Sequence, residues 1–176
     1  MRGRALLFVL ASVAHATPDA DQYFDIGLEY LRKGFFRQAR DAFAESLVRA
    51  PGEPVPMAFM AVACAAEGRP AGEGAILLRW AYQRLPKKKG LRLDLRKILP
   101  SPQALALLQK DYRRRLGRAQ GEQRRKVLRV LAFLEVQDGD PVAAPALDLL
   151  LKEEPKDAYA RALARLRPKP APAPKS

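Results

Sequence analysis

The sequence predicts an all-α fold built from antiparallel helical hairpins, and three observations support this. After Pro18, apolar residues recur at intervals of three or four, which is the spacing of one helix face. No run of four to eight residues shows the β-branched alternation of a strand. Glycines and prolines separate the apolar stretches, as expected where helices end and begin. With 176 residues, 48% of them hydrophobic, the chain can form one domain of ordinary size.

The N-terminus has the pattern of a secretory signal. Two arginines lie among the first four residues, residues 5–13 are apolar, and Ala14-His15-Ala16 has small residues where signal peptidase requires them. We therefore expect cleavage after Ala16 and a periplasmic or secreted protein. The apolar run is shorter than the roughly 20 residues that cross a bilayer, so no transmembrane span is expected after cleavage. Retention of the signal as an anchor remains an open alternative.

The apolar periodicity predicts eight helices, which cover residues 21–33, 36–49, 55–67, 71–85, 102–116, 121–137, 141–152 and 156–166. Glycines are expected where a helix reverses, at Gly34, Gly68 and Gly139. Prolines are expected where the next segment begins, at Pro51, Pro86 and Pro155. The final residues, 167–176, alternate proline with lysine and alanine, which predicts a disordered tail without helical hydrogen bonds.

The most specific pattern joins the first two predicted helices, and it consists of Tyr23, Ile26, Gly27, Tyr30, Ala39, Phe43 and Pro51. Two helices can approach closely where one has a small residue and the other a bulky one. Gly27 and Ala39 allow that approach, while Tyr30 and Phe43 supply the bulk. This spacing resembles the tetratricopeptide repeat.

Two diluted copies of the pattern follow. Residues 54–86 repeat it with Ala61 in place of the glycine, provided that one residue is inserted near Pro70. Residues 128–155 repeat it with one residue missing. The resemblance covers about two thirds of the chain. The linker Leu93-Asp94-Leu95-Arg96 is also similar to that of bacterial secreted or envelope repeat proteins. The expected organisation is therefore a signal at 1–16, two hairpins at 20–87, a basic linker at 88–101, an extra helix with a weaker third hairpin at 102–166, and the tail at 167–176.

The resemblance implies a short right-handed superhelix whose first helices line a concave groove for a partner peptide or helix. It implies no reaction. The corresponding groove positions are Phe24, Leu28, Leu31, Arg32, Ala58, Val62, Arg129 and Phe133. Most of these are apolar, which leaves two interpretations: the groove receives an amphipathic helix of a partner, or the chain's own later helices, such as that at 102–116, fill it.

Positive charge is concentrated in the middle of the chain. Residues 84–126 contain fifteen lysines and arginines against three acidic residues, and this surplus nearly equals the net charge of +13. The candidate anion-binding patch is Lys87, Lys88, Lys89, Arg113, Arg114, Arg115, Arg124, Arg125 and Lys126. Phospholipid headgroups, acidic envelope polysaccharide or an acidic protein would fit it. Nucleic acid is disfavoured because the patch has few aromatic side chains and the chain has a signal. A solvated face without function is the alternative.

The residues needed for catalysis are scarce. The single histidine, His15, lies in the signal, so the mature chain has no Cys-His, Ser-His-Asp or zinc-ligand arrangement. Cys64, Trp80 and Tyr82 are interpreted as core residues, and Glu153-Glu154 as solvated charge at a helix end. We therefore expect no enzymatic activity, cofactor or metal. The leading hypothesis is a protein-binding scaffold of the bacterial envelope or extracellular space, acting through the groove or the basic flank. The alternative is a binder of anionic surfaces.

Overall fold

The structure is a computed structural model, and it describes residues 18–86, 90–138 and 144–167. Within these residues every regular element is a helix and there is no strand, which confirms the all-α prediction. The helices of the described part are α1 (Ala20–Arg32), α2 (Phe36–Arg49), α3 (Pro54–Glu67), α4 (Ala71–Arg84), α5 (Leu95–Ile98), α6 (Pro102–Leu116), α7 (Gly121–Asp138), α8 (Pro145–Glu153) and α9 (Ala158–Ala164).

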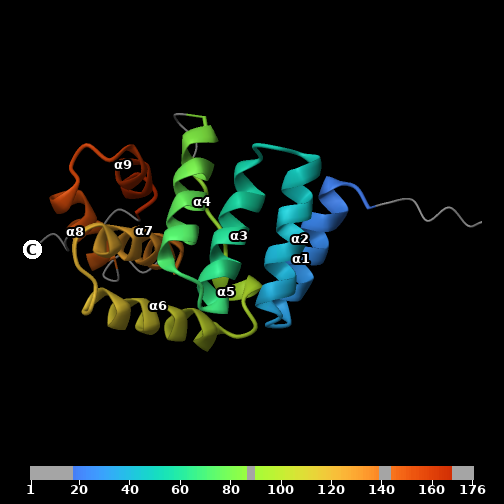
Figure 1. The fold of residues 1–176 in the computed structure, drawn as a ribbon, viewed down its shortest axis with the longest axis horizontal. Coiled ribbons are helices and arrows are strands. Elements are labelled where there is room, and N and C mark those ends of the chain that lie inside the picture. Colours follow the sequence, from blue (N-terminus) through green and yellow to red (C-terminus); the bar gives the residue numbers. More distant parts are fainter. Residues whose placement is uncertain (1–17, 87–89, 139–143, 168–176) are drawn as a thin grey trace, which may run out of the picture.

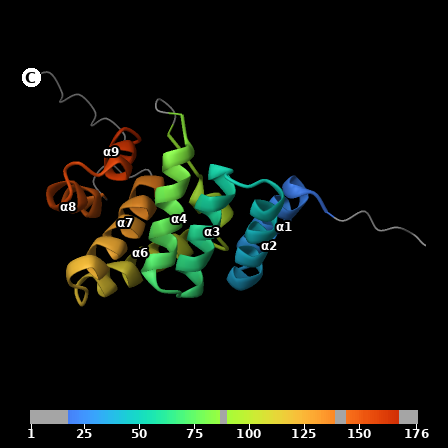
Figure 2. The same ribbon diagram turned by 45° about the horizontal axis from the view of Figure 1, so that its top comes forward.

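The helices pack largely in chain order. The first four stand side by side, with contacts of α1 with α2, α2 with α3, and α3 with α4 (Figure 1). Helix α7 then takes the next position against α4 and packs on α8 (Figure 2). Helix α6 crosses beneath the lower ends of the row and packs on α7, while α9 contacts α4, α7 and α8. The fold is therefore a row of paired helices with one crossing helix at its edge.

The predicted helix bounds agree closely with the observed ones. The bounds of α2 and α6 are as expected, those of α3, α4 and α7 differ by one residue at one end, and those of α1 differ by one residue at both ends. Gly34 and Gly68 have φ angles of +79° and +85°, the left-handed conformation in which a helix reverses without strain at a glycine. The predicted reversal at Gly139, the start at residue 141 and most of the tail lie outside the described residues.

Three expectations about helix ends were wrong. Pro51 does not begin a helix: it lies with Gly52, whose φ is +94°, in the turn before α3, which starts at Pro54. Helix α9 spans only Ala158–Ala164, because Asp157 caps it by accepting hydrogen bonds from the amides of Tyr159 and Ala160. No helix starts at Pro86, and the one-turn helix α5 was not predicted.

The first hairpin is held together by a close approach at Gly27. A Cβ atom on this glycine would lie 2.5 Å from Cε1 of Phe43, closer than any real contact. The Phe43 ring is fully buried and stacks on Phe59 with ring centroids 5.7 Å apart. Because Phe59 belongs to α3, the same aromatic ring packs α2 against both of its neighbours.

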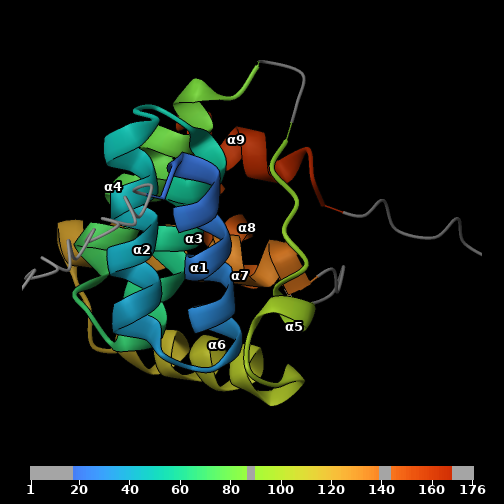
Figure 3. The same cartoon turned by 90° about the vertical axis from the view of Figure 1, so that its right-hand side faces the viewer.

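The predicted basic linker contributes directly to the core. Leu91, Leu93 and Leu95 are buried, whereas Arg92 and Asp94 between them are exposed. This alternation is that of an extended chain with one side on the protein. Figure 3 shows the extended segment running from the region after α4 down to α5. Helix α5 in turn contacts α1, α6 and α7, so the segment joins the two ends of the row.

The side chain of Gln137 holds this segment in place. Its Nε2 donates to the carbonyl of Leu91 at 2.9 Å, and its Oε1 accepts from the amide of Leu93 at 2.7 Å. Tyr82 also donates from its hydroxyl to the Leu91 carbonyl, at 3.3 Å. An extended segment without a neighbouring strand would otherwise leave these buried backbone groups unsatisfied. Gln137 of α7 and Tyr82 of α4 thus make the hydrogen bonds that a neighbouring strand would otherwise make.

Candidate functional site

The predicted groove residues do not form an open surface. Leu31, Ala58, Val62 and Phe133 are fully buried within one continuous core that also contains the leucines of residues 91–99. The chain therefore fills this region itself. Helix α6, named as the candidate to do so, packs instead chiefly on α7.

The remaining predicted groove residues lie in different environments and do not form one surface. The ring of Phe24 packs against Phe43 and Phe59, at centroid distances of 5.7 and 5.6 Å, and so belongs to the packing among α1, α2 and α3. Leu28 is half-buried and Arg32 is exposed. Arg129 is half-buried and takes part in an ion-pair network with the end of α8.

The predicted basic patch is largely paired with acids of the same chain. Lys87, Lys88 and Lys89 lie outside the described residues. The other six belong to α6 and α7, and each has a partner: Arg113 with Glu135, Arg114 and Arg115 with Asp111, Arg124 with Glu153, Arg125 with Glu154, and Lys126 with Glu122. Glu153 and Glu154 are therefore partners of α7 and not merely solvated charge at a helix end. The described part of the patch therefore carries much less unbalanced charge than its sequence indicates.

In the pair of Arg113 with Glu135, the acidic side chain is buried. The side chain of Glu135 is 0% exposed, and its carboxylate accepts hydrogen bonds from Nη2 of Arg113 and from the amide of Ala146, both at 3.0 Å. Burial raises the pKa of Glu135 above its ordinary value, against the opposing effects of these two donors. Arg113 is therefore a structural partner of a buried acid that links α6, α7 and the start of α8.

A cleft that the sequence did not indicate lies between α4 and the segment from the end of α8 through α9. It consists of two adjoining hollows of about 510 and 560 Å³ that share Tyr82, Gln83 and Ala158. The floor includes the rings of Tyr82 and Tyr159, which pack edge to face with centroids 5.1 Å apart. The rim is polar and mostly basic, with Arg79, Gln83, Arg129, Glu154, Lys156, Asp157, Arg161 and Arg165.

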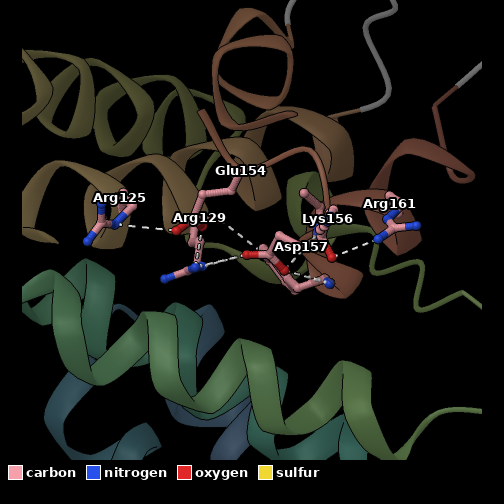
Figure 4. A network of polar contacts seen from close by, with 8 residues as sticks. Arg125, Arg129, Glu154, Lys156, Asp157 and Arg161 are labelled. Atoms are coloured by element: carbon pink, nitrogen blue, oxygen red, sulfur yellow. Dashed lines mark hydrogen bonds and ion pairs between the residues drawn. The ribbon is translucent and has the colours of Figure 1, made fainter. Parts of the chain in front are cut away.

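The two carboxylates of the cleft, Glu154 and Asp157, already form ion pairs with arginines of α7. Figure 4 shows Arg129 of α7 reaching toward Glu154 and Asp157, with Arg125 beside Glu154. Arg129 pairs with Asp157 at 2.9 Å and also with Glu154. Burial opposes ionisation of Asp157, but the hydrogen bonds from Arg129 and from the Tyr159 amide hold its pKa below the ordinary value. For Glu154 burial dominates, and its pKa is raised. The turn before α9 is therefore fixed to α7.

Three basic side chains of the cleft have no acidic partner in the part of the chain that the structure describes. Arg79 and Lys156 make no ion pair there. Arg161 donates only to the backbone carbonyl of Lys156, at 2.8 Å, in the capped turn (Figure 4). The cleft thus combines an apolar aromatic floor with surplus positive charge on its rim, which suits an anionic ligand.

The described residues contain no group of three or more His, Cys, Asp and Glu side chains placed to hold a metal ion. Trp80 was expected in the core, but it is 48% exposed on the outer side of α4. Tyr82 is buried as expected, and burial raises its pKa well above the ordinary value.

Cys64 is expected to be inert in the folded protein. It is 2% exposed on α3, and burial raises the pKa of its thiol to about 11. Because the thiolate is the reactive form, Ellman's reagent at about pH 8 should label no thiol in the native protein and one thiol per chain in denaturant. Native labelling as fast as that of a free cysteine would show that α3 is open to solvent.

The chain matches no protein-family model, no curated protein and no solved structure. Among the described residues, no helix has both the length and the apolar composition needed to cross a bilayer.

Proposed function

We propose that this chain is a non-catalytic scaffold of the tetratricopeptide-repeat kind, which binds a protein partner in the bacterial envelope or extracellular space. The observation that carries the proposal is the nesting of successive helices at small residues. Gly27, Ala39, Ala61 and Ala81 are buried in α1, α2, α3 and α4, and each of these helices packs on the next. A stack of this kind presents a rigid, extended surface, which is what a binding scaffold requires.

Two sequence features add to the proposal. The repeat pattern that begins at Tyr23 supports a short right-handed superhelix, and the signal-like residues 1–16 support export. Since Leu31, Ala58, Val62 and Phe133 are buried, we do not assign partner binding to the predicted concave groove.

The alternative, binding to anionic surfaces through the basic runs of α6 and α7, has less support. The six described members of those runs all pair with acids of the chain itself, which reduces the field that they present to a membrane or polysaccharide. Anionic vesicles therefore serve as a comparison in the binding experiments below.

The scaffold proposal predicts a saturable protein partner. The chain immobilised on beads and mixed with bacterial envelope extract should retain a protein that excess free chain displaces, with identification by mass spectrometry. Heat-denatured chain on the same beads is the control, since it keeps the charge and loses the fold. If no displaceable protein is retained at any of several salt concentrations, the proposal is wrong.

A further inference from the structure

The cleft between α4 and α9 has the dimensions of a short peptide groove. Its wall on α4 extends from Arg79 to Leu85, about 9 Å at 1.5 Å per residue. The opposite wall is α9, about 9 Å long from Ala158 to Ala164 by the same measure, together with the turn that follows it as far as Leu166. An extended chain advances about 3.3 Å per residue, so the groove accommodates three or four residues of an extended segment.

The residues that line this groove between α4 and α9 define what such a segment must contain. The floor is formed by the rings of Tyr82 and Tyr159 together with the apolar side chains of Ala162 and Leu166. A floor of this kind takes an apolar side chain. The rim has Arg79 on one side and Lys156 and Arg161 on the other, without acidic partners in the described part of the chain. These basic groups lie where the flanking residues of a bound peptide would be.

The acidic residues of the cleft do not neutralise this rim. Glu154 and Asp157 are both engaged by Arg129, and Glu154 also by Arg125. An anionic ligand would therefore meet unmatched positive charge on both walls. The C-terminal tail of the chain itself is a poor occupant, because residues 168–176 contain two lysines and no acid.

We propose that the groove between α4 and α9 binds an extended acidic segment of a protein partner, in which carboxylates flank an apolar side chain. The proposal rests on the scaffold function above and names the surface and the chemistry of its partner. Carboxylates on the segment pair with Arg79, Lys156 and Arg161, while the apolar side chain lies on the tyrosine floor.

The test uses fluorescently labelled peptides and the full chain. A Glu-Asp-Leu-Asp-Glu peptide is compared with its neutral counterpart, Gln-Asn-Leu-Asn-Gln, by fluorescence anisotropy at about 0.15 M salt. The groove variant carries Arg79→Gln, Lys156→Gln and Arg161→Gln. The matched control carries Arg37→Gln, Lys110→Gln and Arg118→Gln, three exposed basic residues that do not line the groove, so both variants lose the same charge. Circular dichroism and thermal melting establish that both remain folded.

The acidic peptide should bind the native chain at least about tenfold more tightly than the neutral peptide. The groove variant should lose at least about tenfold in affinity for it, and the control less than about threefold. Equal losses in the two variants would mean non-selective charge attraction, and equal binding of both peptides would mean apolar docking. Binding of neither peptide would mean that the groove takes no such segment. Each of these results overturns the proposal.

Two further comparisons separate this proposal from the others. If anionic vesicles bind and the groove variant abolishes that binding while the acidic peptide does not bind, the groove serves a lipid surface and the peptide proposal fails. If the groove variant still retains the partner captured from envelope extract, the scaffold function stands and only the groove assignment fails. If the native chain captures no partner, the scaffold function itself fails.

Discussion

Gly27→Val is expected to destabilise the protein by about 2–3 kcal/mol and to lower its melting temperature by about 5–10 °C. The first atom of any side chain at Gly27 would lie 2.5 Å from Cε1 and 2.6 Å from Cδ1 of Phe43. Phe43 cannot move away, because it is fully buried and its ring packs on Phe24 and Phe59. Urea denaturation of the native chain and the variant measures the difference in the free energy of unfolding.

Gly72→Val is the matched control. Gly72 also lies in a helix, but a Cβ there would meet only the flexible side chain of Lys126, at 3.5 Å from its Cδ. We expect a change within about 0.5 kcal/mol. Combining Gly27→Val with Phe43→Leu should cost less than the sum of the two single changes, since the smaller side chain leaves room for the valine. Equal losses at Gly27 and Gly72 would contradict the close packing of α1 on α2.

Arg113→Met is expected to cost about 1–3 kcal/mol, because it leaves the Glu135 carboxylate buried without its cation. The lower part of that range applies if water reaches the site, since the Arg113 side chain itself is 47% exposed. Arg114→Met, one position along the same helix, removes a side chain that is 68% exposed and should cost less than about 0.5 kcal/mol. Thermal and urea denaturation of both variants provides the comparison.

The pH dependence of the Arg113→Met deficit has a defined sign. Burial already raises the pKa of Glu135 in the folded chain, and loss of Arg113 raises it further. The folded variant therefore gains more from protonating this carboxyl than the unfolded chain does. The deficit should be largest at about pH 8 and should shrink as the pH falls toward about 5, where a protonated Glu135 no longer needs a cation. A deficit that grows on acidification would show that Glu135 is not its source.

The helices were predictable from the sequence because their signals are local. The apolar spacing and the glycines at positions 34 and 68 act within one or two turns, and they placed the ends of most helices within a residue. The start of α9 was missed although its signal is also local. Asp157 caps this helix by accepting from the Tyr159 amide, but the sequence alone does not distinguish it from other acidic residues nearby.

The candidate site was not predictable, because its determinants are far apart in the chain. The acids that pair with Arg124 and Arg125 come almost thirty residues later, so a count of charge within residues 84–126 overstated the free positive charge. The cleft joins Arg79 to Lys156, which only the packing of α9 on α4 brings together. The alternating leucines of the linker were the one available sign that residues 91–95 would cover the inner helices. The alternation extends over only these five residues, which is too few to predict an extended segment.

The hydrogen bonds of Gln137 to the backbone of Leu91 and Leu93 have a consequence for the order of folding. These hydrogen bonds span 46 and 44 residues, because Gln137 lies in α7, which follows the linker in the chain. The row α1–α4 consists of neighbours in the chain, whose pairing requires only short loops. The hydrogen bonds from Gln137 can form only once α7 has reached the linker, so we expect closure of the linker over the inner helices to follow the pairing of α1–α4.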